Sequence, residues 1–144
     1  MTLAEPVTKP IFGPITVEEM RANEALTRLV LRVVGEACKH SKGRYSAATI
    51  AQGISQGEMK LWGVLTPPDK LDAAVVTRVN GPVCEIIVAG PDFDDVLPFM
   101  GMLKRYAKGQ HCERLALNGP YFFRRQLPGW KVREVRFECD LAAD

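Results

Sequence analysis

Apolar residues recur at helical spacing in the first third of the chain. The repeating positions are Ala22, Leu26, Leu29, Val30, Val33 and Ala37. This period predicts one amphipathic helix over residues 17–39. Thr16 and Glu19 have the spacing of a capping box, in which a hydroxyl and a carboxylate satisfy the backbone N–H groups at a helix start. A second, shorter helix is predicted over residues 46–54, with a serine as its cap.

The middle of the chain changes to the pattern of β-strands. Apolar and β-branched runs over residues 59–65, 73–79 and 83–89 predict three strands. The second and third runs are separated by Asn80 and Gly81, a dipeptide that favours positive φ. We therefore expect these two strands to form an antiparallel hairpin.

Helical spacing returns after the third run. It predicts a helix over residues 95–109, with Asp95 as its N-cap. A short strand is expected over residues 113–117 and a short helix over residues 121–126. In residues 134–141 apolar and polar side chains alternate, which predicts a final strand with one buried face.

The length and composition favour a single domain of the α/β (α+β) class. The chain has 144 residues, of which 47% are hydrophobic, enough for one core. Residues 1–15 are rich in proline and predict an extended arm or one edge strand, before a single domain over residues 16–144. No apolar run reaches the length of a membrane span, and no signal-peptide pattern opens the chain. The four cysteines form no CxxC pair, so we expect buried free thiols in a reducing compartment.

Positive charge is concentrated in the C-terminal third. The formal net charge is +2, yet nine of the lysines and arginines lie within residues 104–136. A basic segment of this kind serves an anionic ligand, a nucleic acid or an acidic protein partner, or is a solvated face without a ligand.

Several short motifs, taken in order, resemble one known fold. They are Lys60-Leu61-Trp62-Gly63, Ala107-Lys108-Gly109-x-x-Cys112, Leu115-x-Leu117-Asn118 and Leu127-Pro128-Gly129-Trp130-Lys131. With the predicted order of elements, residues 59–141 resemble the GNAT (Gcn5-related N-acetyltransferase) fold, and more specifically the GNAT-like proteins of tailed bacteriophages and prophages. The resemblance implies a mixed, mostly antiparallel sheet with helices on both faces.

The cofactor loop departs from the pattern of active GNAT enzymes. Active members have a Q/R-x-x-G-x-G/A loop after the fourth strand, whose backbone N–H groups hold the pyrophosphate of acetyl-CoA. The equivalent stretch here, residues 90–95, contains a proline without an N–H group and three aspartates. The positions equivalent to the family's cofactor contacts are Gly90, Asp92, Phe93, Asp94, Asn118 and Arg125. The resemblance therefore implies a degenerate site, and the aspartates also suit helix N-caps.

Catalytic groups are few as well. If the protein is active, the resemblance places the general base at Glu85 and the acid at Tyr121, because Arg125 occupies the family's usual tyrosine position. The two histidines, His40 and His111, have no partners at the spacing of a catalytic triad or a metal site, so no metal is expected.

Two functions follow from the resemblance. The first is a phage-type GNAT-fold protein that works without a cofactor, as a virion-associated or assembly factor in contact with other protein subunits. The second is an active acyl-CoA-dependent N-acetyltransferase that uses acetyl-CoA. Nucleic-acid binding is a third reading, which no recognised motif supports. The expected location is the host cytoplasm or the virion, and a homo-oligomer stays open.

Overall fold

The computed structural model describes residues 9–41, 45–67 and 70–117. These residues contain a five-stranded sheet in the order β1-β2-β3-β4-β5. Strands β1 to β4 pair antiparallel, and β5 runs parallel to β4. The elements are β1 (Ile11–Pro14), α1 (Val17–Ala22), α2 (Glu24–Ala37), α3 (Ala47–Ser55), β2 (Lys60–Thr66), β3 (Lys70–Asn80), β4 (Val83–Gly90), α4 (Met100–Gly109) and β5 (Arg114–Leu117), with 3₁₀ turns at Cys38–Ser41, Phe93–Asp95 and Leu97–Phe99.

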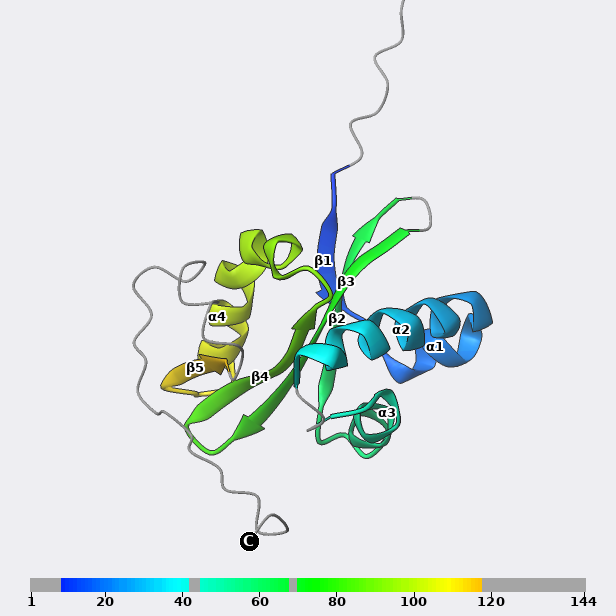
Figure 1. Cartoon of the computed structure of the whole chain (residues 1–144). Helices are drawn as coiled ribbons and strands as arrows, with labels where there is room; N and C mark the ends of the chain where they lie inside the picture. The colour runs from blue at the N-terminus through cyan, green and yellow to red at the C-terminus, as the bar shows by residue number, and fades with distance from the viewer. Residues whose placement is uncertain (1–8, 42–44, 68–69, 118–144) are drawn as a thin grey trace, which may run out of the picture.

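Helices cover both faces of the sheet. Figure 1 shows α1, α2 and α3 on one side of the strands and α4 on the other. One core packs α2 and α3 on the first face, through buried residues such as Val34 and Ile50. A second core packs α4 on the opposite face, around Trp62 and Leu103. The predicted fold class, a mixed and mostly antiparallel sheet between helices, is confirmed.

The predicted hairpin and the second helix are confirmed in detail. β3 and β4 pair antiparallel up to Asn80 and Val83, and Gly81 has a φ of 60° in the turn. Ser46 accepts a hydrogen bond from the Thr49 amide at 3.2 Å and caps α3. These elements are set by local residue choice, which is why the sequence pattern located them.

The prediction of one continuous helix over residues 17–39 is wrong. Asn23 interrupts it with an extended backbone, between α1 and α2. The Asn23 side chain accepts a hydrogen bond from the Leu26 amide at 3.0 Å, so it starts α2 as a new N-cap. Asparagine competes for backbone groups in this way more effectively than it supports a helix interior. The predicted cap at Thr16 is confirmed, because its hydroxyl oxygen accepts from the Glu19 amide at 3.1 Å.

The helix after β4 begins later than predicted. The α-helix starts at Met100, and two 3₁₀ turns occupy the residues that the prediction assigned to its first turns. Asp92, rather than Asp95, caps the first of these turns. Pro98 explains the delay, because it lacks an N–H group and disfavours the α conformation at Leu97 before it.

Part of the N-terminal segment belongs to the sheet. The sequence predicted either an extended arm or an edge strand for this segment. The structure shows an edge strand, since β1 pairs antiparallel with β2. Phe12 is buried and stacks on the rings of Trp62 and Phe99, with centroid distances of 5.4 and 5.1 Å.

The predicted helix over residues 121–126 and the strand over residues 134–141 lie outside the described residues. In the part that is described, no helix is long and apolar enough to cross a membrane.

The cysteines in the described ranges are free thiols. Cys38 and Cys84 are buried, as expected, and Cys112 is half-buried. Burial raises the pKa of Cys84 from 9.0 to about 11, with smaller contributions from Cys112 and Glu85. The folded protein therefore keeps a proton that the unfolded chain loses first.

This shift predicts a loss of stability in alkali. The contribution of the Cys84 thiol is fully present below about pH 9 and is lost as the pH rises toward about 11, up to roughly 2 to 3 kcal/mol. Denaturant unfolding at about pH 8 and about pH 10.5 measures the loss. Cys84→Ala should show a smaller loss over the same interval, and an equal loss in both proteins would contradict the assignment.

Candidate functional site

Backbone amides of the loop after β4 donate hydrogen bonds to acceptors within the same loop. The Asp94 amide donates to the Asp92 carboxylate at 3.0 Å, and the Asp95 amide donates to the Asp92 carbonyl at 3.1 Å. The next amide, of Val96, donates to the Phe93 carbonyl at 3.0 Å. Pro91 has no N–H group to contribute. Three amides of the loop, those of Asp94, Asp95 and Val96, are thus bonded within the chain.

The charge of the loop also disfavours an anion. Asp92, Asp94 and Asp95 are exposed side by side. Burial raises the pKa of the Asp95 carboxyl group, and the charges of Asp92, Asp72 and Asp94 add to the rise, while Lys70 opposes it. A carboxylate that its neighbours repel lies in a negative potential. The bonded amides and the negative charge of the loop both oppose the docking of a pyrophosphate there.

Two other predicted cofactor positions are packed inside the protein. Phe93 is 3% exposed and belongs to the core beneath α4. Gly90 is buried with a φ of 156°, and a Cβ added there would lie 3.6 Å from the Cβ of Ala37. Asn118 and Arg125 lie outside the described residues, so their assignment stays a prediction.

Strands β4 and β5 pair over only half of β4. Their register runs from Val83 opposite Arg114 to Ile86 opposite Leu117. At Ile87 the pairing of β4 with β3 shifts by one residue, which is a β-bulge. Within the described ranges, residues 87–90 therefore have no strand on their β5 side. An open strand edge of this kind can pair with the amide groups of a ligand.

Glu85, the predicted base, lies in a polar cluster that β4 forms with its other neighbour, β3. It is directly opposite Arg78 on β3, and its Oε2 accepts a hydrogen bond from Arg78 Nη2 at 3.2 Å. Its Oε1 accepts from Asn80 Nδ2 at 3.0 Å. Burial lowers the pKa of Arg78, but the hydrogen bond and the charge of Glu85, together with smaller contributions from Tyr45, raise the pKa overall.

The role of Glu85 as a base stays a prediction. To take a proton, the carboxylate would have to release at least one of these two partners. The predicted acid, Tyr121, lies outside the described residues. His111 is exposed, and the part of the chain that the structure describes holds no group of three potential metal ligands.

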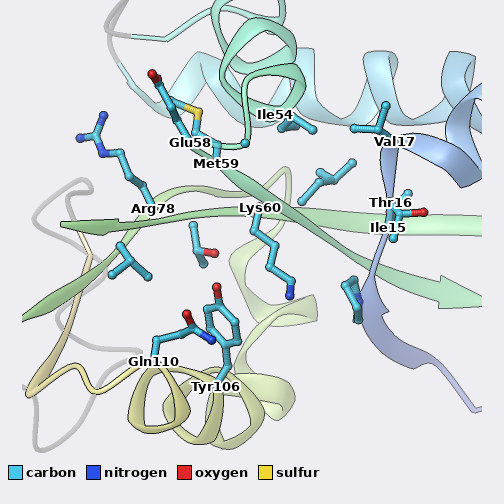
Figure 2. Close-up of a pocket in the computed structure, with 15 residues that line it drawn as sticks. Ile15, Thr16, Val17, Ile54, Glu58, Met59, Lys60, Arg78, Tyr106 and Gln110 are labelled. Carbon is cyan, nitrogen blue, oxygen red and sulfur yellow. The ribbon is translucent and has the colours of Figure 1, made fainter. Parts of the chain in front are cut away.

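A pocket of about 670 Å³ lies at the opposite end of β3 from the aspartate loop. Its walls come from the β1–α1 junction, the segment from α3 to β2, the end of β3 and helix α4. Figure 2 shows Lys60, Tyr106 and Gln110 on the α4 side of the strands, and Ile54 and Met59 on the α3 side. Of the site residues predicted from the sequence, those that the structure describes (Glu85, Gly90, Asp92, Phe93 and Asp94) do not line this pocket.

The sequence pattern contained only weak signals for these lining residues. Lys60 is a charged residue at the start of an apolar strand, and Tyr106 lies beside the apolar face of its helix. A terminal lysine and a half-buried tyrosine are ordinary in a strand and a helix. Only their contact on the α4 side of the sheet distinguishes them.

Comparison with solved structures identifies the fold. The chain superimposes on the aminoglycoside 6'-N-acetyltransferase AAC(6')-Ih of Acinetobacter baumannii with a TM-score of 0.63 at 12% identity, covering 92% of this chain and 98% of that one. An acetyltransferase of Trypanosoma brucei gives 0.60 at 14% identity, covering 92% and 100%. AAC(6')-Iy, in complex with the bisubstrate analog CoA-S-monomethyl-acetylneamine, gives 0.61 at 10% identity, covering 92% and 99%. No protein-family model matches the chain, and no curated protein matches it. At identities this low, the comparison shows the fold alone. Because the structural agreement spans almost the whole length of the chain, the protein has the fold of the GNAT acetyltransferases.

Proposed function

We propose that this protein uses the GNAT fold as a scaffold for contacts with other protein subunits, without acetyl-CoA chemistry. The observation that carries the proposal is the bonding of the loop after β4, where the Asp94 and Asp95 amides are both held by Asp92. The resemblance to phage-encoded GNAT-like proteins supports a virion-associated or assembly role, in the host cytoplasm or the particle.

Electrostatic magnitudes support the same conclusion. A pyrophosphate brings two or more negative charges next to Asp92, Asp94 and Asp95. Each pair of like charges about 4 Å apart costs on the order of 1 kcal/mol in water and several at lower dielectric. Hydrogen bonds to the phosphate would offset little of this cost, because each amide of the loop would only exchange one acceptor for another.

An active acyl-CoA-dependent N-acetyltransferase is the second candidate. The open edge of β4 at residues 87–90 favours it, since that edge offers backbone groups to a ligand. The names of the structural neighbours, one of them bound to a coenzyme A bisubstrate analog, favour it as well. In this candidate Glu85 is the base and Tyr121 the acid.

Titration with acetyl-CoA separates the two candidates. We expect the unmodified protein to bind acetyl-CoA with a dissociation constant no better than the millimolar range, about −4 kcal/mol. Asp92→Gly combined with Asp94→Gly should tighten binding, because it removes two charges and frees the Asp94 amide. Isothermal titration at low and high salt measures both effects, and the repulsion should weaken as ions screen it.

The matched control removes two charges elsewhere. Glu18 and Glu113 are exposed and lie outside the loop, so Glu18→Gln with Glu113→Gln should leave the affinity close to that of the unmodified protein. Micromolar binding by the unmodified protein would overturn the scaffold proposal in favour of the enzyme. If neither the unmodified protein nor the loop variant binds, the fold is retained for its protein contacts alone.

A further inference from the structure

Lys60 lies over two aromatic rings and, among the residues that the structure describes, has no anionic partner. Its Nζ is 5.0 Å from the centroid of the Trp62 ring and 4.8 Å from that of the Tyr106 ring. Among the described residues it forms neither an ion pair nor a hydrogen bond. Aromatic faces attract a cation but do not replace ordinary acceptors for the three N–H bonds of an ammonium group. The Lys60 side chain therefore retains donors that face the pocket.

Two further polar groups lie beside Lys60. The Tyr106 ring packs edge-on against Trp62, with centroids 4.9 Å apart, and within the described ranges its hydroxyl group makes no hydrogen bond. Burial raises the pKa of Tyr106, with further increases from Cys84 and Cys112, so the phenol stays protonated and can donate. The side chain of Gln110, the C-cap residue directly after α4, is exposed at the edge of the same pocket (Figure 2).

The other charged groups that line the pocket do not neutralise Lys60. Arg78 is already paired with Glu85 at 3.2 Å. The Glu58 side chain lies on the α3 side of the strands, whereas that of Lys60 extends toward α4 (Figure 2). On the α4 side, the described lining of the pocket thus combines one cation that has no ion-pair partner in those ranges with a neutral phenol and an amide.

We propose that this pocket binds a small organic carboxylate. The Lys60 ammonium and the Tyr106 hydroxyl donate to the carboxylate oxygens, which is the pairing that two converging donors favour. Pro14 and Val79 supply apolar contacts for the body of the ligand. The volume of about 670 Å³ is within the range of small-molecule sites, so the ligand is larger than the carboxylate alone. This site does not depend on the proposed scaffold function, because it is separate from the aspartate loop.

Benzoate and its uncharged analogue benzamide are suitable probes. In an NMR titration of the whole protein, we expect benzoate to shift the amide signals of Lys60, Tyr106 and Gln110 in a saturable manner. A ligand of this size should bind with a dissociation constant in the millimolar range. Benzamide should bind about tenfold more weakly, because it lacks the charge that pairs with Lys60.

Three variants locate the interaction. Lys60→Met keeps the length of the side chain and should weaken benzoate binding about tenfold, while Tyr106→Phe removes only the hydroxyl and should weaken it about fivefold. Lys108→Met, on the exposed surface of α4 and outside the pocket, is the matched control and should bind like the unmodified protein.

Three results would each overturn the proposal. They are the absence of saturable shifts at these residues, equal affinity for benzoate and benzamide, and an unchanged affinity in folded Lys60→Met. If Lys60→Met does not fold, Tyr106→Phe and the benzamide comparison decide the matter. If benzoate does not bind, the interpretation of the acetyl-CoA titration does not change, since that experiment concerns the aspartate loop at the opposite end of β3.

Discussion

Replacing Trp62 with alanine is expected to lower the free energy of unfolding by roughly 3 to 5 kcal/mol, the cost of deleting a large buried aromatic side chain. The indole ring is 6% exposed and stacks on Phe12 with an interplanar angle of 3°. It also packs edge-on against Tyr106 at 4.9 Å. Its Nε1 donates to the Thr77 hydroxyl at 3.0 Å in the buried interior. One ring thus connects β1, β2, β3 and α4.

Urea unfolding of Trp62→Ala and Trp62→Phe tests this role. Phenylalanine keeps most of the apolar contact but leaves the Thr77 hydroxyl without its donor, so it should cost only about 1 to 3 kcal/mol. A loss below about 1 kcal/mol for Trp62→Ala would show that the four elements do not depend on this ring.

Replacing Leu103 with alanine is expected to cost roughly 2 to 5 kcal/mol, because the substitution leaves a cavity beneath α4. Leu103 is 0% exposed and lies in the core that holds this helix on the sheet. Its neighbour Met102 is 38% exposed on the same helix. The two positions therefore differ in burial while they share a helix and its propensities.

Met102→Ala is the matched control for Leu103→Ala. It should change the free energy of unfolding by less than about 1 kcal/mol, because little buried volume is lost. Comparable losses at both positions, measured by urea denaturation, would mean that α4 does not pack through the face that contains Leu103.

At the aspartate loop, the local sequence pattern predicted part of the observed structure. The sequence predicted that these aspartates cap a helix rather than hold a phosphate, and the bond from the Asp94 amide to Asp92 agrees with capping. It did not predict which aspartate is the cap, because that depends on where Pro98 allows the helix to begin. A cap is chosen by backbone conformation over several residues, and residue type alone leaves more than one choice.

The pocket that contains Lys60 could not be predicted from the sequence. Its walls come from four segments, and Lys60 and Tyr106 are 46 positions apart in the chain. Neither residue belongs to a motif whose chemistry is read from spacing. Similarly, the resemblance implied that Glu85 is the base, while its two partners, Arg78 and Asn80, followed only from the register of β3 and β4.

The sequence by itself determined the elements whose signals are local: the period of the helices, the β-branched strands, and the turn at Gly81. These signals depend on neighbouring residues and survive without knowledge of the fold. The tertiary structure alone decided the parallel pairing of β5 with β4, the half-length of that pairing, and the meeting of Lys60 with the Trp62 and Tyr106 rings. Such contacts are set by how whole elements pack, and the free energy that selects them comes from burial shared among distant residues.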